Sequence, residues 1–171
     1  KMFVDKATIK VAAGHGGAGS CSFRREMFVP YGGPDGGDGG KGGDVILKAS
    51  SNERSLVDLK FQPNWRAKRG GDGAGQKMHG KNADDCIIKV PVGTIVFDSE
   101  TDELICDMKE DGQECIVAKG GRGGLGNVHF VSSVNQAPRK CQPGTDGEEK
   151  TLDLELKTVA EVGLVGYPNA G

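Results

Sequence analysis

The last residues of the chain have a spacing that suits a nucleotide phosphate. Gly166-Tyr167-Pro168-Asn169-Ala170-Gly171 has the form Gly-x-x-x-x-Gly and follows the short apolar run 162–165. A phosphate-binding loop continues with Lys, which reaches the β- and γ-phosphates, and then with Ser or Thr, whose hydroxyl binds Mg²⁺. These two residues are not present, because the sequence stops at Gly171. We therefore expect a fragment that cannot bind or hydrolyse a nucleotide by itself.

Basic side chains form a second chemical pattern. The net charge is −2, but residues 60–81 and 119–142 are strongly basic, whereas residues 98–114 are strongly acidic. This segregation favours one basic and one acidic face over scattered surface charge. Basic residues among glycines suit contacts with RNA phosphates. The candidate RNA-binding residues in these segments are Lys68, Arg69, Lys77, Lys81, Arg139 and Lys140.

Glycine repeats connect these basic positions. Residues 36–43 read Gly-Gly-Asp-Gly-Gly-Lys-Gly-Gly, and further glycine clusters occupy 14–19, 70–80 and 120–126. A three-residue period fits the left-handed polyproline II helix, and glycine allows neighbouring backbones to approach closely. A flexible linker is the alternative, but such linkers are usually rich in serine. We expect an ordered bundle in which these segments hydrogen-bond side by side and the amides of 36–43 are protected from exchange.

Short alternating segments predict the strands that position the glycine loops. The expected strands are 3–11, 20–25, 44–48, 86–90, 94–97, 104–108, 114–119 and 151–157, with 86–90 and 94–97 forming a hairpin. The pattern predicts a mainly β fold, a small barrel or sandwich, from one end of which the loops 24–35, 68–82 and 135–146 project as a basic tip. Phe61 and Trp65 could stack on bases, but we expect them to pack in the core.

Composition excludes several classes of protein. The chain of 171 residues has no apolar run long enough to cross a membrane. Its five cysteines and three histidines lack the close pairs of a zinc site, so we expect no bound metal and reduced, cytoplasmic thiols. The carboxylates lie in turns and charge runs, and we identify no catalytic residue.

Several motifs together resemble the N-terminal domain of the Obg family of GTPases. They are Phe23-Arg24-Arg25-Glu26, the run 29–40 (Val-Pro-Tyr-Gly-Gly-Pro-Asp-Gly-Gly-Asp-Gly-Gly), Lys89-Val90-Pro91-Val92-Gly93-Thr94, the run 118–127 and the final Gly-Tyr-Pro-Asn-Ala-Gly. The resemblance covers the whole chain. It implies left-handed glycine-rich helices on a small β-barrel over residues 1–158, and the first strand and partial phosphate loop of a GTPase domain over 159–171.

The resemblance also implies a function. Obg proteins act with the large (50S) ribosomal subunit in its assembly and in stress control, and the N-terminal domain docks on ribosomal RNA. The full-length protein would use GTP and Mg²⁺, whereas this chain would be a monomeric binding module. The alternative is a domain that docks a stress-regulatory protein or the parent's own GTPase domain.

Two positions depart from the family pattern, because Met27 and Tyr31 stand where the family often has lysine. The first loop thereby loses positive charge, while Tyr31 becomes a candidate for stacking on an RNA base. Arg24 and Arg25 could pair with carboxylates of the glycine bundle or contact RNA.

Overall fold

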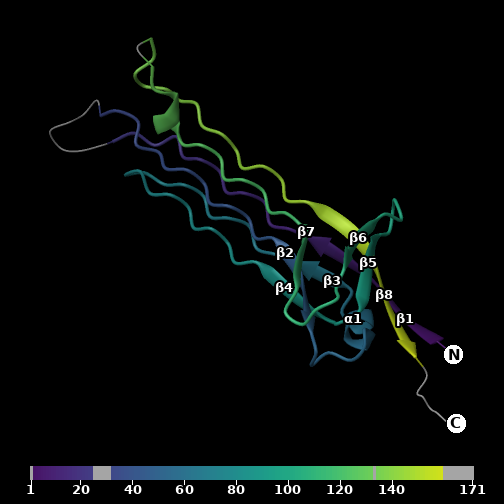
Figure 1. Cartoon of the computed structure of the whole chain (residues 1–171). Helices are drawn as coiled ribbons and strands as arrows, with labels where there is room; N and C mark the ends of the chain where they lie inside the picture. Colours follow the sequence, from purple (N-terminus) through teal and green to yellow (C-terminus); the bar gives the residue numbers. More distant parts are fainter. Residues whose placement is uncertain (1, 25–31, 133, 160–171) are drawn as a thin grey trace, which may run out of the picture.

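The strands of this protein form two mixed sheets (Figure 1). The computed structural model describes residues 2–24, 32–132 and 134–159. One sheet has the order β3-β1-β8-β5-β6 and the other β4-β2-β7. The strands are β1 Met2–Ala12, β2 Val45–Ser50, β3 Asn64–Arg66, β4 Cys86–Pro91, β5 Thr94–Asp98, β6 Leu104–Asp107, β7 Glu114–Ala118 and β8 Glu149–Val159. The predicted mainly β fold is confirmed, with two sheets rather than a closed barrel.

Helix is scarce in the described ranges. The α-helix α1 spans Val57–Phe61, and the 3₁₀-helix η1 spans Asn127–Phe130. In the described residues, no helix combines the length and the apolar character needed to cross a bilayer.

The apolar core lies between the two sheets. β1 and β8 pair antiparallel from Met2↔Val159 to Ala12↔Glu149, which places Ile9 opposite Leu152 and Ala7 opposite Leu154. These alternating side chains are buried, as the period of two along a strand requires. The second sheet contributes to the same core through the buried residues Val45, Leu47, Ile88, Val90 and Val117.

Three sequence-based expectations were wrong. β4 and β5 do not form a hairpin, because β4 pairs with β2 while β5 pairs with β6 and β8. Residues 20–24 form only an isolated bridge, Phe23↔Pro34, instead of a strand. Phe61, at the end of α1, is 84% exposed, whereas Trp65 packs against the core as expected.

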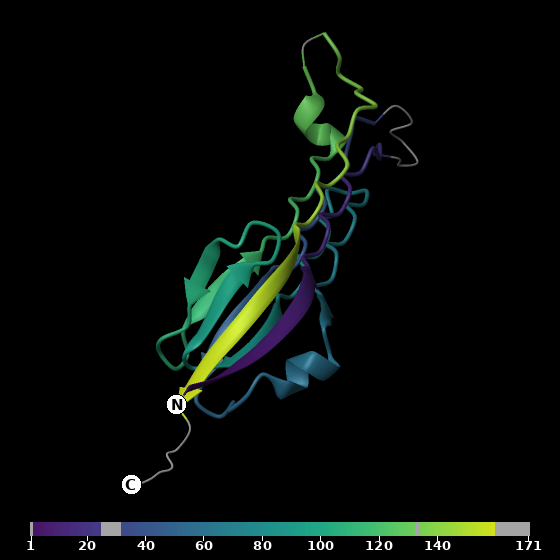
Figure 2. The ribbon, with the colours of Figure 1, turned by 90° about the vertical axis from the view of Figure 1, so that its right-hand side faces the viewer.

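A long glycine-rich arm extends from one end of the sandwich (Figures 1 and 2). It consists of extended segments that continue six of the strands: 13–24 after β1, 32–44 before β2, 67–75 after β3, 77–85 before β4, 119–126 after β7 and 138–148 before β8. Neighbouring segments hydrogen-bond in steps of three residues: the N–H groups of Gly14, Gly17 and Ser20 donate to the carbonyls of Gly43, Gly40 and Gly37. This period agrees with the predicted polyproline II-type bundle.

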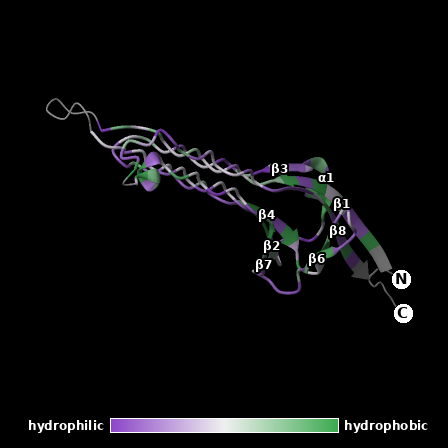
Figure 3. Ribbon diagram, turned by 90° about the horizontal axis from the view of Figure 1, so that it is seen from above, coloured by the Kyte–Doolittle hydropathy of each residue, from purple (hydrophilic) through white to green (hydrophobic). Residues whose placement is uncertain are grey.

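Glycine is required in the arm by close backbone approach. A Cβ on Gly17, Gly39 or Gly123 would lie within 3.0 Å of a carbonyl group in a neighbouring segment. None of these glycines has a positive φ; among the described glycines only Gly93 and Gly112 do. Because backbones rather than side chains meet inside the arm, it has little apolar interior. The hydrophobic residues concentrate in the sandwich and at parts of the far end of the arm (Figure 3).

Candidate nucleic-acid interface

The far end of the arm presents the turns that join its segments. We call this region the distal end and define it as residues 20–24, 32–38, 74–80, 125–132 and 134–142. Its described surface comes from turns far apart in the sequence, which the bundle holds side by side (Figure 2). A docking surface at this place depends on the rigidity of the arm beneath it.

Every backbone N–H from Gly36 to Asp44 donates a hydrogen bond. Five of the acceptors are carbonyls of neighbouring segments, namely those of Ala74, Gly124, Gly71, Gly121 and Lys68. The remaining acceptors are side-chain atoms of Asn127, His79, Asn82 and Asp85. The segment 36–43 is thus ordered by its neighbours, which supports the expected amide protection.

Side-chain acceptors repeat every three residues along two segments. The N–H groups of Asp38, Lys41 and Asp44 donate to the side chains of His79, Asn82 and Asp85, respectively. Likewise, the N–H groups of Leu125, Arg122 and Lys119 donate to the side chains of Gln142, Thr145 and Glu148. These polar residues are structural, because their side chains accept hydrogen bonds from backbone amides of neighbouring segments.

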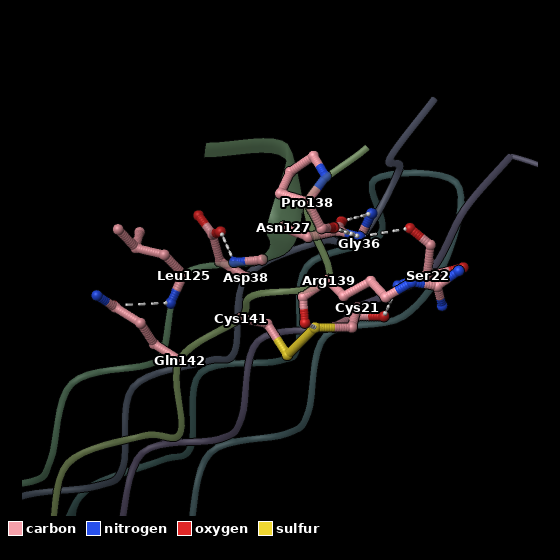
Figure 4. The surroundings of a disulfide bond; sticks show 12 residues. Cys21, Ser22, Gly36, Asp38, Leu125, Asn127, Pro138, Arg139, Cys141 and Gln142 are labelled. Carbon is pink, nitrogen blue, oxygen red and sulfur yellow. Dashed lines mark hydrogen bonds between the residues drawn. A yellow bond between two sulfur atoms is a disulfide. The ribbon is translucent and has the colours of Figure 1, made fainter. Parts of the chain in front are cut away.

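Asn127 ties three segments together where the distal end begins (Figure 4). Its side chain is fully buried, and Oδ1 accepts the N–H of Gly36 at 2.9 Å. Nδ2 donates to the carbonyls of Ser22 at 2.9 Å and Pro138 at 3.3 Å. One amide group therefore satisfies backbone groups of three turns, which fixes their relative positions.

Asp38 makes a second connection at the same level. Its Oδ1 accepts the N–H of Gly126 at 2.8 Å and lies 2.9 Å from His129 Nε2 on η1. Burial alone would raise the pKa of Asp38, but the hydrogen bonds from Gly126 and His129 outweigh burial and lower the pKa below its ordinary value. The carboxylate is thus kept ionised and occupied within the arm.

Acid should weaken the arm through Asp38. Because its folded pKa lies below the unfolded value near ~3.9, ionised Asp38 stabilises the fold above the unfolded pKa, and this contribution is lost as the pH falls through the folded pKa. Asn at this position cannot ionise. The difference in free energy of unfolding between wild type and Asp38→Asn, measured by urea denaturation, should therefore shrink as the pH is lowered from about 6 to about 3.

The matched control for this experiment is Asp84→Asn. The Asp84 carboxylate has no hydrogen bond or ion pair within the described ranges. Its substitution should change the free energy of unfolding at pH 6 far less than Asp38→Asn does. If the difference in free energy of unfolding between wild type and Asp38→Asn stayed constant over the pH range, the role assigned to Asp38 would be contradicted.

A disulfide joins Cys21 to Cys141 at the distal end (Figure 4). The two residues are 120 positions apart in sequence, and their Cα atoms are 5.5 Å apart. Cys86, Cys106 and Cys115 are free. The expectation of thiols only was therefore wrong: the bundle places segments 13–24 and 138–148 side by side, which cysteine spacing could not show.

The structure divides the predicted RNA-binding residues into two groups. Lys77, Arg139 and Lys140 lie at the distal end: Lys77 is in the turn between Ala74 and Met78, and Arg139 is next to the disulfide region. The Arg139 guanidinium lies 5.6 Å from the centre of the Phe23 ring, and Lys140 Nζ lies 5.0 Å from that of Phe130. These aromatic contacts orient both cations at the surface.

Lys68, Arg69 and Lys81 form the second group, nearer the sandwich. The carbonyl of Lys68 accepts the N–H of Gly43, immediately before β2. At the rise of a polyproline II helix, Lys68 is roughly 19 Å from Ala74 along the arm. Arg69 pairs with Asp72 at 2.8 Å. These cations line the side of the arm and do not belong to the tip.

Several predicted positions lie outside the described residues. These are Tyr31, Arg25 and the phosphate-loop residues 166–171. Arg24 is described, and its backbone N–H donates to the carbonyl of Gly33 at the distal end.

Charge at the distal end is mostly positive. Arg24, Lys77, Arg139 and Lys140 lie in its described ranges, with Asp35 and Asp38 as the carboxylates. Asp35 is buried, and Asp38 is bound to His129. The acidic segment 98–114 belongs to β5, β6, β7 and their connections in the sandwich. The segregation expected from the sequence therefore exists in space, between arm and sandwich.

Cations held beside aromatic rings at the distal end are suited to phosphate contacts and stacking. Among the described residues, no group of three or more His, Cys, Asp or Glu side chains could hold a metal ion. Sequence reasoning missed Asn127, Asp35 and the acceptors at 79, 82, 85, 142, 145 and 148. Their three-residue spacing was a usable signal for the acceptors, whereas nothing local marked Asn127 or Asp35.

The chain is similar to known proteins over nearly its whole length. The GTP1/OBG family profile matches residues 4–158. A protein named GTPase Obg from Chlorobaculum tepidum is 59% identical over 169 residues, which are 99% of this chain and 50% of that protein. A GTPase Obg from Desulfatibacillum aliphaticivorans is 57% identical over the same shares. The chain thus spans about half the length of these relatives.

Proposed function

Because this chain belongs to the GTP1/OBG family, we propose that its glycine-rich arm docks the distal end on RNA of the large ribosomal subunit. The observation that carries the proposal is the set of Lys77, Arg139 and Lys140 at the end of a hydrogen-bonded arm. Cations held on a rigid, narrow projection suit a recessed RNA surface, where phosphates are the dominant contacts.

We further propose a function for the full-length protein. It is a cytoplasmic GTPase that uses GTP with Mg²⁺ and acts in assembly of the large subunit and in stress control. Residues 1–158 form the docking domain, and 159–171 begin the GTPase domain with the phosphate loop Gly166–Gly171. Residues 1–171 alone do not bind or hydrolyse GTP, because the Lys and Ser/Thr of that loop are not among them.

A protein partner is the second candidate. Met78, Val131 and Val134 are exposed apolar side chains at the distal end, and an apolar protein surface could cover them. Salt distinguishes the two candidates, because phosphate contacts weaken steeply with salt and apolar contacts do not.

The test is co-sedimentation of residues 1–171 with isolated large subunits over a salt series. We expect saturable binding that Lys77→Glu/Arg139→Glu/Lys140→Glu abolishes. If each of these three cations contacts a phosphate, the three together contribute about two to three units to the slope of log affinity against log salt concentration. The variant should lose that part of the slope. Binding that does not respond to salt would favour the protein-partner candidate.

The matched control reverses the same charge at the base of the arm. Lys68→Glu/Arg69→Glu/Lys81→Glu changes net charge equally but lies away from the distal end. It should reduce affinity far less than the distal variant. Equal losses would show that binding follows total charge, and docking by the distal end would then be excluded.

A further inference from the structure

We propose that a hollow at the distal end receives one unpaired nucleobase and reads its amino group with the carboxylate of Asp35. The hollow has a volume of about 470 Å³, within the range of small-ligand sites. Its lining includes Ser22, Phe23, Asp35, Gly75, Gln76 and Met78. This inference rests on the proposed RNA docking and identifies what one part of the surface would bind.

Asp35 has one carboxylate oxygen without a partner. The residue is only 8% exposed, and its Oδ2 accepts the N–H of Gln76 at 3.0 Å. Its backbone is fixed as well, since the N–H donates to Ser22 and the carbonyl accepts from Lys77. Oδ1 is buried and has no hydrogen-bond partner in the described part of the chain. A buried acceptor left unsatisfied is costly, so Oδ1 is suited to a donor supplied by a ligand.

Gly75 lets the backbone pass close to Ser22 and Asp35 at one wall of the hollow. A Cβ on Gly75 would lie 2.7 Å from Ser22 Oγ and 3.8 Å from Asp35 Oδ1. Gly75 does not have a positive φ, so the backbone itself would accept alanine. A side chain at position 75 would therefore displace the Ser22 hydroxyl, which also lines the hollow.

Apolar groups line other parts of the hollow. Phe23 is half-buried, with the Arg139 guanidinium over its ring, and Met78 is 57% exposed. Aromatic and thioether groups contact the faces of flat rings favourably. An apolar wall beside a single acceptor matches an unstacked base, which has an apolar face and a donor at its edge.

The chemistry of the donor follows from the single free oxygen. Cytosine, adenine and guanine carry exocyclic amino groups that donate to a carboxylate, as Asp and Glu accept from cytosine N4. In uracil the N3–H donor lies between two carbonyl acceptors, which repel a carboxylate. A metal ion would need more ligands than Asp35 supplies. The described residues contain no group of three or more His, Cys, Asp or Glu side chains that could hold one. We therefore assign the hollow to amino-bearing bases.

The test is titration of the isotope-labelled 171-residue protein with CMP and UMP, followed by NMR of its amides. Both ligands carry the same phosphate, so differences between them report on the base. We expect CMP to shift the Gln76 and Gly75 amides at roughly tenfold lower concentration than UMP. Asp35→Asn, which preserves shape and an oxygen to accept from Gln76, should abolish that preference.

Gly75→Ala and Gly33→Ala provide a matched pair. Alanine at 75 should weaken CMP binding by displacing the Ser22 hydroxyl within the hollow, whereas a Cβ on Gly33 meets nothing within 4 Å and should have no effect. Equal affinity for CMP and UMP, no site-specific shift up to about 10 mM, or preferential binding of a guanidinium compound such as N-acetylarginine amide would each overturn the inference.

Subunit binding separates this inference from the proposed function. If the wild-type chain co-sediments with large subunits but shows no base preference, only the nucleobase hollow is excluded. If the chain does not co-sediment at all, docking on the large subunit is excluded, and a base preference by NMR would then indicate a different RNA.

Discussion

Gly123→Ala should unfold the arm while leaving the sandwich folded. A Cβ at this position would overlap the carbonyl of Gly39, and both groups are backbone, so neither can rotate away. The segments 119–126 and 32–44 would have to separate, and the hydrogen bonds from Gly39 and Gly42 to Gly124 and Gly121 would break. We expect a loss above ~4 kcal/mol in arm stability, within the exceptional range for one substitution.

Amide hydrogen exchange measures this effect directly. In wild type, the amides of residues 36–43 should exchange slowly, because all of them donate hydrogen bonds. In Gly123→Ala they should exchange nearly as fast as free peptide, while β1 and β8 remain protected. Gly33→Ala is the control, since open space surrounds that position. If the amides of residues 36–43 were protected in Gly123→Ala as strongly as in wild type, the close approach of these segments would be contradicted.

Removing the Cys21–Cys141 disulfide should lower the free energy of unfolding by about 3–5 kcal/mol. The bond closes a loop across 120 residues, and the stabilisation that a disulfide gives by restricting the unfolded chain grows with loop length. Cys21→Ser/Cys141→Ser and the reduced wild type should have the same lowered stability in urea denaturation. The reducing environment of a cytoplasm would favour this less stable form.

Thiol counting and a control variant complete the experiment. The oxidised protein should have three reactive thiols after denaturation, Cys86, Cys106 and Cys115, and all five after reduction. Cys86→Ser should keep its sensitivity to reductant, whereas the double variant should lose it. Five thiols in the protein purified under oxidising conditions would refute the disulfide.

Local patterns predicted most strands of this fold, but not β3 or the short helices α1 and η1. Alternation identified β1 and β8, because a strand with one buried face repeats every two residues. The three-residue glycine period predicted the hydrogen-bonded bundle, because close packing of extended backbones excludes Cβ atoms at regular intervals. Both signals lie within a few consecutive residues, and the charge segregation likewise follows whole segments.

Strand partners could not be predicted in the same way. The sequence around Pro91-Val92-Gly93 resembles a hairpin turn, yet β4 and β5 enter different sheets. The choice depends on which pairing buries Ile88, Val90 and Val96 together between the sheets. Phe61 shows the opposite error: its aromatic type suggested the core, but its position at the end of the short α1 leaves it at the surface.

The sequence by itself determined every strand except β3, the glycine bundle, the division into basic and acidic segments and the family to which the chain belongs. Only the tertiary structure decided that Lys77 lies at the tip while Lys68 lies at the base, that Cys21 meets Cys141, and that Asp35 keeps one oxygen unpaired. The physical reason is range. Periodicity and charge are properties of neighbouring residues, whereas these contacts join segments that meet only because the arm folds back on itself several times.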